Sequence, residues 1–252
     1  MKSYLIACVF TGVLILGACK DTQNSQTENT NGQLRELGLT PTSSAESKAS
    51  STGTEARKVW PPASDESVSD QTIENYLVVL DDSGSMKGNR IQQAKEALTT
   101  LADTLDPKHN LGLIQLNGNK VIQLATSNRR EFKNAVAGAV AEGGTPLTKG
   151  TKRAYREVTK QASRQQGYGG YHMIIVTDGE SGDGSPMKMV RAIVRNTSIQ
   201  VHVIGFHLNN HEMNNQDYVD YHTANNADEL VKAFEAVAAE TNEFTDPKEF
   251  NR

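Results

Sequence analysis

The sequence predicts an α/β fold: a doubly wound (Rossmann-like), mostly parallel sheet with one antiparallel edge strand and helices on both faces. Two observations predict it. From residue 73 onward, short apolar runs alternate with longer segments in which apolar residues recur every three or four positions, as in strands separated by amphipathic helices. Between two of the short runs stands the pair Asn117-Gly118, a strong hairpin signal, so one strand beside it is expected to run antiparallel.

The expected strands are short runs rich in Val, Ile and Leu. We place them at residues 75–80, 111–116, 121–124, 172–177, 199–206 and 218–224. The expected helices each carry one apolar face. We place them at residues 89–105, 128–140, 147–162, 187–195 and 228–239. In the second helix, an N-cap at Ser127 or Asn128 puts Phe132, Val136 and Val140 on the inward face.

The chain is expected to hold one folded domain with appendages. We divide it into a leader at residues 1–18, a polar tether at 19–72, the folded domain at 73–240 and a loose tail at 241–252. The tether is rich in Ser, Thr, Asn and Gln, and its sparse apolar residues do not offset the entropy of ordering it. The only tryptophan, Trp60, is interpreted as packing where the tether meets the domain; an extended docking segment is the alternative.

Charge and cysteine content exclude several function classes. The net charge is −4, with acidic and basic residues interspersed, so a nucleic-acid-binding surface is not expected. The two cysteines, Cys8 and Cys19, both precede the folded domain. A disulfide framework, thiolate metal sites and cysteine nucleophiles are therefore excluded there.

Acids and hydroxyls stand where apolar runs end. Two predicted strands are each followed directly by an aspartate, and a glycine pair precedes a threonine between them. The set comprises Asp81, Ser83, Ser85, Thr145 and Asp178. Because open α/β sheets bind ligands at the carboxyl ends of their strands, we expect these side chains to meet at one edge. Oxygen ligands of this kind suit a hard divalent cation.

Three motifs carry a resemblance to a known family. They are Asp81-x-Ser83-x-Ser85, Gly143-Gly144-Thr145-Pro146-Leu147 and Thr177-Asp178-Gly179. In order and rough spacing they resemble the metal-ion-dependent adhesion site of von Willebrand factor type A (VWA) domains. The resemblance implies binding rather than catalysis: Ser83, Ser85 and one acid hold the cation directly, and an acidic residue of a protein partner completes the metal shell. Mg²⁺ is the expected ion, with Mn²⁺ or Ca²⁺ as alternatives, and Asp82 is expected to point away from it.

Two other functions stay open. In a membrane-tethered scaffold of an envelope assembly, or of an ATPase chaperone, the metal would be purely structural. A magnesium-dependent phosphoester hydrolase would also place acids at strand ends, but no phosphate-binding glycine loop with a lysine accompanies them. His207 and His211 have helical spacing within a polar stretch, and we favour scattered surface histidines over a second metal site.

The amino-terminal residues resemble a bacterial lipoprotein signal. A positive start and a short apolar run end in Leu16-Gly17-Ala18-Cys19. The resemblance implies that Cys19 carries the acyl chains, palmitate among them, that anchor the protein in the cell envelope. Lys20 after this cysteine favours the outer over the inner membrane in a Gram-negative cell. An ordinary signal peptide is the alternative.

Overall fold

The computed structural model describes residues 38, 60, 73–118, 120–165, 169–208 and 210–240. Apart from Gly38 and Trp60, the predicted leader, the tether with Cys19 and the tail lie outside these residues. Within the part described, no helix combines the length and the apolar character needed to cross a membrane.

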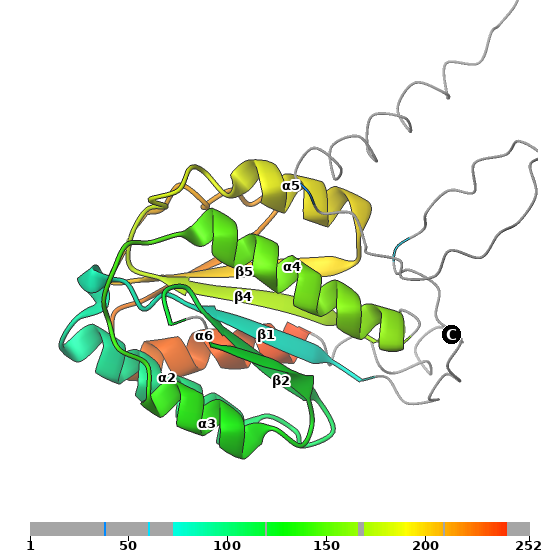
Figure 1. Cartoon of the computed structure of the whole chain (residues 1–252), viewed down its shortest axis with the longest axis horizontal. Helices are drawn as coiled ribbons and strands as arrows, with labels where there is room; N and C mark the ends of the chain where they lie inside the picture. The colour runs from blue at the N-terminus through cyan, green and yellow to red at the C-terminus, as the bar shows by residue number, and fades with distance from the viewer. Residues whose placement is uncertain are drawn as a thin grey trace, which may run out of the picture.

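A six-stranded sheet forms the centre of the described structure (Figure 1), with the strand order β3-β2-β1-β4-β5-β6. The strands are β1 (Asn75–Leu80), β2 (Asn110–Gln115), β3 (Val121–Ala125), β4 (Tyr171–Thr177), β5 (Ile199–Phe206) and β6 (Asp220–Ala224). All neighbours pair in parallel except β2 and β3, which form the hairpin that Asn117-Gly118 predicts. The predicted fold class, including its antiparallel edge strand, is confirmed.

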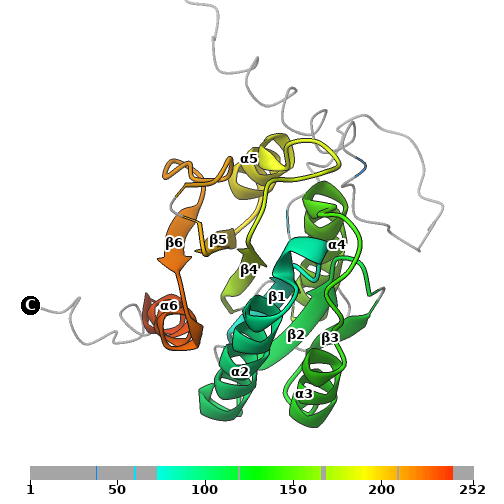
Figure 2. The same ribbon diagram turned by 90° about the vertical axis from the view of Figure 1, so that its left-hand side faces the viewer.

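Helices cover both faces of this sheet. They are α2 (Asn89–Thr104), α3 (Arg129–Ala137), α4 (Leu147–Arg164), α5 (Met187–Asn196) and α6 (Ala227–Glu240), with a short 3₁₀ turn η1 at Gly84–Met86. Helices α4 and α5 lie on one face, and α2, α3 and α6 lie on the other (Figures 1 and 2). The helices on each face pack against the sheet and form a separate apolar core there. The central strands are therefore buried on both sides.

The central strand β1 shows how the sequence sets this arrangement. Tyr76, Val78 and Leu80 pack into the core under α2 and α6, whereas Leu77 and Val79 pack under α4. Strands β1 and β4 run in parallel and in register, and the ladder continues one residue beyond β1, where the Asp81 N–H donates to the Val176 carbonyl at 2.9 Å. The residues that follow both strands therefore emerge side by side at one edge.

Helix α3 differs from the prediction. It ends at Ala137, and the following Gly138 is its C-cap, so the helical phase does not reach Val140, whose side chain is 64% exposed. The prediction that Val140 faces inward is wrong. Asn128 precedes the helix but makes no capping hydrogen bond; its amide donates to the carbonyls of Leu111 and Gln123 and ties the start of the helix to β2 and β3.

Trp60 packs on the folded domain. Its indole N–H donates to Thr159 Oγ1 at 3.4 Å, and its ring meets Tyr171 edge to face at 5.3 Å between centroids. The packing interpretation is confirmed. Since Tyr171 is the first residue of β4, Trp60 sits at the amino end of this strand.

Candidate metal centre

Asp81 follows β1 with its carboxylate fully buried. Each oxygen accepts a hydrogen bond: Oδ1 from the Ser83 N–H at 2.9 Å, and Oδ2 from the Thr177 hydroxyl at 2.6 Å. Thr177 is the last residue of β4, so the acid at the end of one strand is oriented by its neighbour in the sheet. The first bond also turns the backbone after Asp81 sharply, which brings Ser83 and Ser85 back over the strand end.

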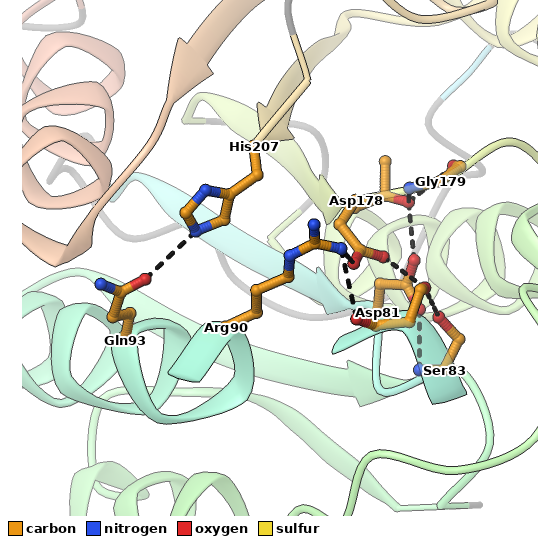
Figure 3. Close-up of polar contacts among 9 residues, drawn as sticks. Asp81, Ser83, Arg90, Gln93, Asp178, Gly179 and His207 are labelled. Atoms are coloured by element: carbon orange, nitrogen blue, oxygen red, sulfur yellow. Dashed lines mark hydrogen bonds and ion pairs between the residues drawn. The ribbon is translucent and has the colours of Figure 1, made fainter. Parts of the chain in front are cut away.

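A line of hydrogen bonds joins this loop to Asp178. The Ser83 and Ser85 hydroxyl oxygens lie 3.0 Å apart, and Ser85 Oγ donates to Asp178 Oδ1 at 2.6 Å. The second carboxylate oxygen, Oδ2, is paired with Arg90 Nη1 at 2.7 Å. The Asp178 side chain is fully buried, whereas that of Arg90 is 41% exposed. Figure 3 shows the Arg90 guanidinium reaching from α2 towards Asp178, with Asp81 and Ser83 beside it.

Thr145 comes to the same edge on a third loop. The Gly84 N–H donates to the Gly143 carbonyl at 3.0 Å, and the Gly182 N–H donates to the Thr145 carbonyl at 2.8 Å. A Cβ atom at Gly179 would lie 3.9 Å from Ser85 Oγ and 4.0 Å from Thr145 Oγ1, so both hydroxyls flank the backbone of this glycine. The structure therefore brings all of the predicted site residues to one edge of the sheet.

The electrostatics of this edge favour a bound cation. Burial raises the pKa of Asp81, hydrogen bonds from Thr177 and Ser83 oppose the shift, and the nearby charge of Asp178 adds to it. A carboxylate that is desolvated and close to a second carboxylate is held in its ionised form best by a positive charge placed between them. Arg90 supplies one positive charge, but only to the outer oxygen of Asp178.

Comparison with known proteins identifies the family. The profile of the von Willebrand factor type A domain matches residues 76–245. The chain belongs to this family. Among curated proteins, the VWA domain is 28% identical over 137 residues to an uncharacterized protein of Synechocystis sp., covering 52% of this chain and 32% of that protein. It is 27% identical over 128 residues to inter-alpha-trypsin inhibitor heavy chain H4 of Sus scrofa, covering 47% and 14%. The chain thus spans a third or less of these relatives.

Solved structures share the fold of this VWA domain. Proximal thread matrix protein 1 from the mussel byssus superimposes with a TM-score of 0.54 at 19% identity, covering 66% of this chain and 47% of that one. The von Willebrand factor type A protein from Catenulispora acidiphila superimposes with a TM-score of 0.52 at 19% identity, covering 68% of this chain and 43% of that one. The vWF domain of the type V pili tip protein Mfa5 from Porphyromonas gingivalis superimposes with a TM-score of 0.51 at 10% identity, covering 69% of this chain and 97% of that one. At these identities the likeness concerns the fold alone.

Asp82, the second acid after β1, has a different role from Asp81. Its carboxylate is buried and points away, towards the turn between β2 and β3, where Oδ1 accepts the Asn117 N–H at 2.7 Å and Oδ2 accepts the Gly118 N–H at 3.1 Å. The Asn117 side chain then donates to the Gly144 carbonyl at 2.8 Å. Asp82 thus fixes the hairpin turn against the glycine loop that carries Thr145.

Asp183 anchors the start of α4. Its two oxygens accept the N–H groups of Thr148 and Lys149 at 2.9 and 3.0 Å, and its Oδ1 also accepts the Ser181 hydroxyl. Burial acts to raise the pKa of Asp183, but these hydrogen bonds outweigh it and hold the pKa below the usual value. The loop after Asp178 is thereby attached to the helix that follows Thr145.

Histidines are more buried than the sequence analysis expected. The sequence analysis favoured scattered surface histidines, yet His109, His172, His202 and His211 are buried. His211 Nδ1 accepts the Met213 N–H at 3.0 Å, so its Nε2 carries the proton and donates to the Gly179 carbonyl at 2.8 Å. His211 therefore ties the loop before β6 to the candidate metal centre. His207 lies apart, with Nε2 3.2 Å from Gln93 Oε1 (Figure 3).

The sequence analysis did not name two contributors to this site, Arg90 and Asp183. It quoted Thr177 within a motif but did not predict its hydrogen bond to Asp81. Thr177 carried a usable signal, because a hydroxyl directly before a strand-end acid can reach the acid of the adjacent strand. Arg90 and Asp183 act across 88 and 35 residues of chain. No local pattern marks such pairs.

Proposed function

We propose that this VWA domain binds a divalent cation and, through the cation, a protein partner. The residues that would hold the ion are Asp81, Ser83, Ser85, Thr145 and Asp178. The observation that carries the proposal is the unbroken line from Asp81 through Ser83 and Ser85 to Asp178, which gathers two buried carboxylates and two hydroxyls from adjacent strands.

The donor set fits a hard cation. All of the side-chain donors are oxygens, and Mg²⁺ takes one or two carboxylates together with neutral oxygens and water. Mg²⁺ is the ion we expect, with Mn²⁺ or Ca²⁺ as alternatives. A bound ion would neutralise the paired acids and offer an outward coordination position to a carboxylate of the partner. A mussel byssus neighbour of this fold, with a TM-score of 0.51 at 18% identity, has a metal-ion-dependent adhesion site occupied by zinc.

Recognition of the partner would come from the loops around the ion. Residues 180–185 and the stretch at 208–217 both attach to the Asp178-Gly179 turn, the second through His211, and Ser181 N–H is also held by Glu212 Oε1 at 3.0 Å. An acidic side chain of the partner would enter between them. This is a binding function without turnover, and it matches the non-catalytic role that the family resemblance implies.

We also propose that the protein is a lipoprotein of the bacterial cell envelope, anchored through acylated Cys19. The support is the Leu16-Gly17-Ala18-Cys19 sequence after a short apolar run. Lys20 favours the outer membrane in a Gram-negative cell. The VWA domain would then be displayed at the membrane surface.

The first experiment measures metal binding and partner capture with the same proteins. Mg²⁺ and Mn²⁺ are titrated into the wild type, Asp81→Ala and the control Asp103→Ala, which removes an exposed aspartate paired with Lys133. Immobilised protein is then exposed to envelope extract with Mg²⁺ or with chelator. We expect Asp81→Ala and chelation each to abolish capture, whereas Asp103→Ala binds as the wild type does. Capture that survives chelation would show that the ion is not part of the interface.

The second experiment tests the anchor. Cys19→Ser removes the acylated residue, and the control Cys8→Ser removes the other cysteine within the apolar run. We expect Cys19→Ser to move the protein from the membrane to the soluble fraction, while Cys8→Ser stays with the membrane. Membrane association of Cys19→Ser would contradict the lipoprotein assignment.

A further inference from the structure

A second group of metal-ligating side chains lies at the β6 edge of the sheet. His202 is in β5, and Asp220 and His222 are in β6, the last strand (Figure 2). His202 is directly opposite Asp220 in the parallel register, and Asp220 and His222 are two residues apart, so all three share one face. Each offers one ligand atom, and these atoms lie within 4.8 Å of one another. We call these three residues the edge histidine cluster.

The edge histidine cluster is separate from the candidate metal centre. It connects inward to His172, the second residue of β4, whereas Asp178 follows the last residue of the same strand. Six residues of extended chain place these two positions about 20 Å apart. The cluster shares its face with Ile204 and Ala224, which belong to the core under α6.

A buried relay runs from the cluster to the other side of β4. His202 Nδ1 lies 3.1 Å from Asp220 Oδ2, and His202 Nε2 lies 3.2 Å from His172 Nδ1. His172 Nε2 lies 3.2 Å from Glu74 Oε2, and the Tyr76 ring stacks on His172 at 4.8 Å between centroids. His172 and His202 are almost fully buried.

His222 adds a third ligating side chain to the cluster. Its Nε2 approaches the same Asp220 oxygen at 2.5 Å, so two imidazole nitrogens converge on one carboxylate oxygen. In the tautomer whose Nε2–H faces His172, His202 offers the lone pair of Nδ1 to the cluster. Asp220 and His222 are 39% and 22% exposed, which gives an ion access from solvent.

The geometry points to a Zn²⁺ site formed by His202 Nδ1, Asp220 Oδ2 and His222 Nε2, with water in the fourth position. Two imidazoles and one carboxylate are a usual protein ligand set for zinc. A ligating histidine that donates its other N–H inward, through His172 to Glu74, matches the supporting shell that orients histidine ligands around metals. Bound Zn²⁺ would fasten the edge strand β6 to β5 and, through it, fix the entry to α6.

The test is Zn²⁺ titration of the full chain, by calorimetry and by elemental analysis after gel filtration. Every protein carries Asp81→Ala, so that the proposed cation site does not contribute. Asp220→Asn and His222→Ala are compared with His207→Ala, which removes a histidine outside the cluster. We expect each cluster variant to bind one Zn²⁺ fewer than His207→Ala, and Zn²⁺ to raise Tm for His207→Ala but not for the cluster variants.

A supporting variant tests the relay. Glu74→Gln leaves all three ligands in place and replaces the carboxyl group behind His172, so Zn²⁺ affinity is expected to fall about 10–100-fold. Asp220→Asn nearly preserves shape, and far-UV circular dichroism confirms that each variant is folded. Equal Zn²⁺ stoichiometry and affinity in Asp220→Asn, His222→Ala and His207→Ala would overturn the proposal.

Discussion

Replacing Thr177 with valine tests how the buried acid of the candidate metal centre is held. The Thr177 hydroxyl donates a 2.6 Å hydrogen bond to Asp81 Oδ2, and both side chains are fully buried. Valine has nearly the same shape and lacks the hydroxyl, so Thr177→Val removes the donor without opening a cavity. The ionised form of Asp81, which is the form that binds a cation, loses support. We therefore expect weaker Mg²⁺ binding by a folded domain.

Two independent arguments give the size of the effect. A hydrogen bond to a charged group contributes about 1.5–3 kcal/mol. If that full amount appears in cation binding, the dissociation constant rises about 10- to 150-fold. Loss of a partner behind a metal ligand typically weakens metal binding about 10–100-fold. The ranges overlap, so we expect Thr177→Val to bind Mg²⁺ about 10–100-fold more weakly than the wild type.

Isothermal titration with Mg²⁺ at neutral pH measures this change. The matched control is Thr177→Ser, which keeps the hydroxyl and removes only a methyl group, and it should bind nearly as the wild type does. Unfolding curves in urea establish that both variants are folded. Equal Mg²⁺ affinity in Thr177→Val and Thr177→Ser would refute the argument that the Asp81 carboxylate is oriented by its neighbour in the sheet.

Three further predictions concern stability and packing. Asp82→Ala should lower the free energy of unfolding by about 2 kcal/mol, because charged hydrogen bonds to the hairpin turn are lost; urea denaturation measures this, and a change as small as that of surface Asp103→Ala would contradict it. Asp183→Ala should lower the free energy of unfolding by about 1 kcal/mol at neutral pH, as the loss of a helix cap does. Because the folded-state pKa of Asp183 is lowered, this stabilisation is present above the ordinary pKa of 3.8 and is lost as the pH falls through the folded-state value; a difference that persists at lower pH would count against the cap. The fluorescence of Trp60, the only tryptophan, should shift to the red together with the loss of far-UV circular dichroism, and a separate earlier transition would show that its packing is not coupled to the domain.

Much of the fold could be predicted because its central strands are apolar on both faces. Strands β1 and β5 begin and end where the apolar runs do, and the hairpin follows from Asn117-Gly118. The end of α3 could not be placed from periodicity, since Gly138 closes the helix before Val140. The residue at which α3 ends depends on the backbone conformation and on contacts of the loop that follows.

The candidate metal centre, too, could be predicted from the sequence only in part. The acids and hydroxyls at strand ends are visible in the sequence because parallel strands share one carboxyl edge. Arg90 reaches Asp178 from a helix, and this pairing depends on how α2 packs rather than on any local pattern. His172 and His202 did carry a signal: each occupies the same alternation as Ile174 and Ile204 within a buried run, which predicts an inward face.

Trp60 and the candidate metal centre lie at opposite ends of β4. Its partners are Tyr171, at the amino end of β4, and Thr159 on the neighbouring helix, whereas Asp178 emerges from the carboxyl end of the same strand. The strand runs from one pole of the domain to the other, about 20 Å away. If the chain is held at a membrane through Cys19, the segment that comes from the membrane meets the domain at one pole, and the cation-binding loops open at the opposite one. In that arrangement, the VWA domain would present its binding loops away from the membrane, towards partners that approach from beyond the lipid surface.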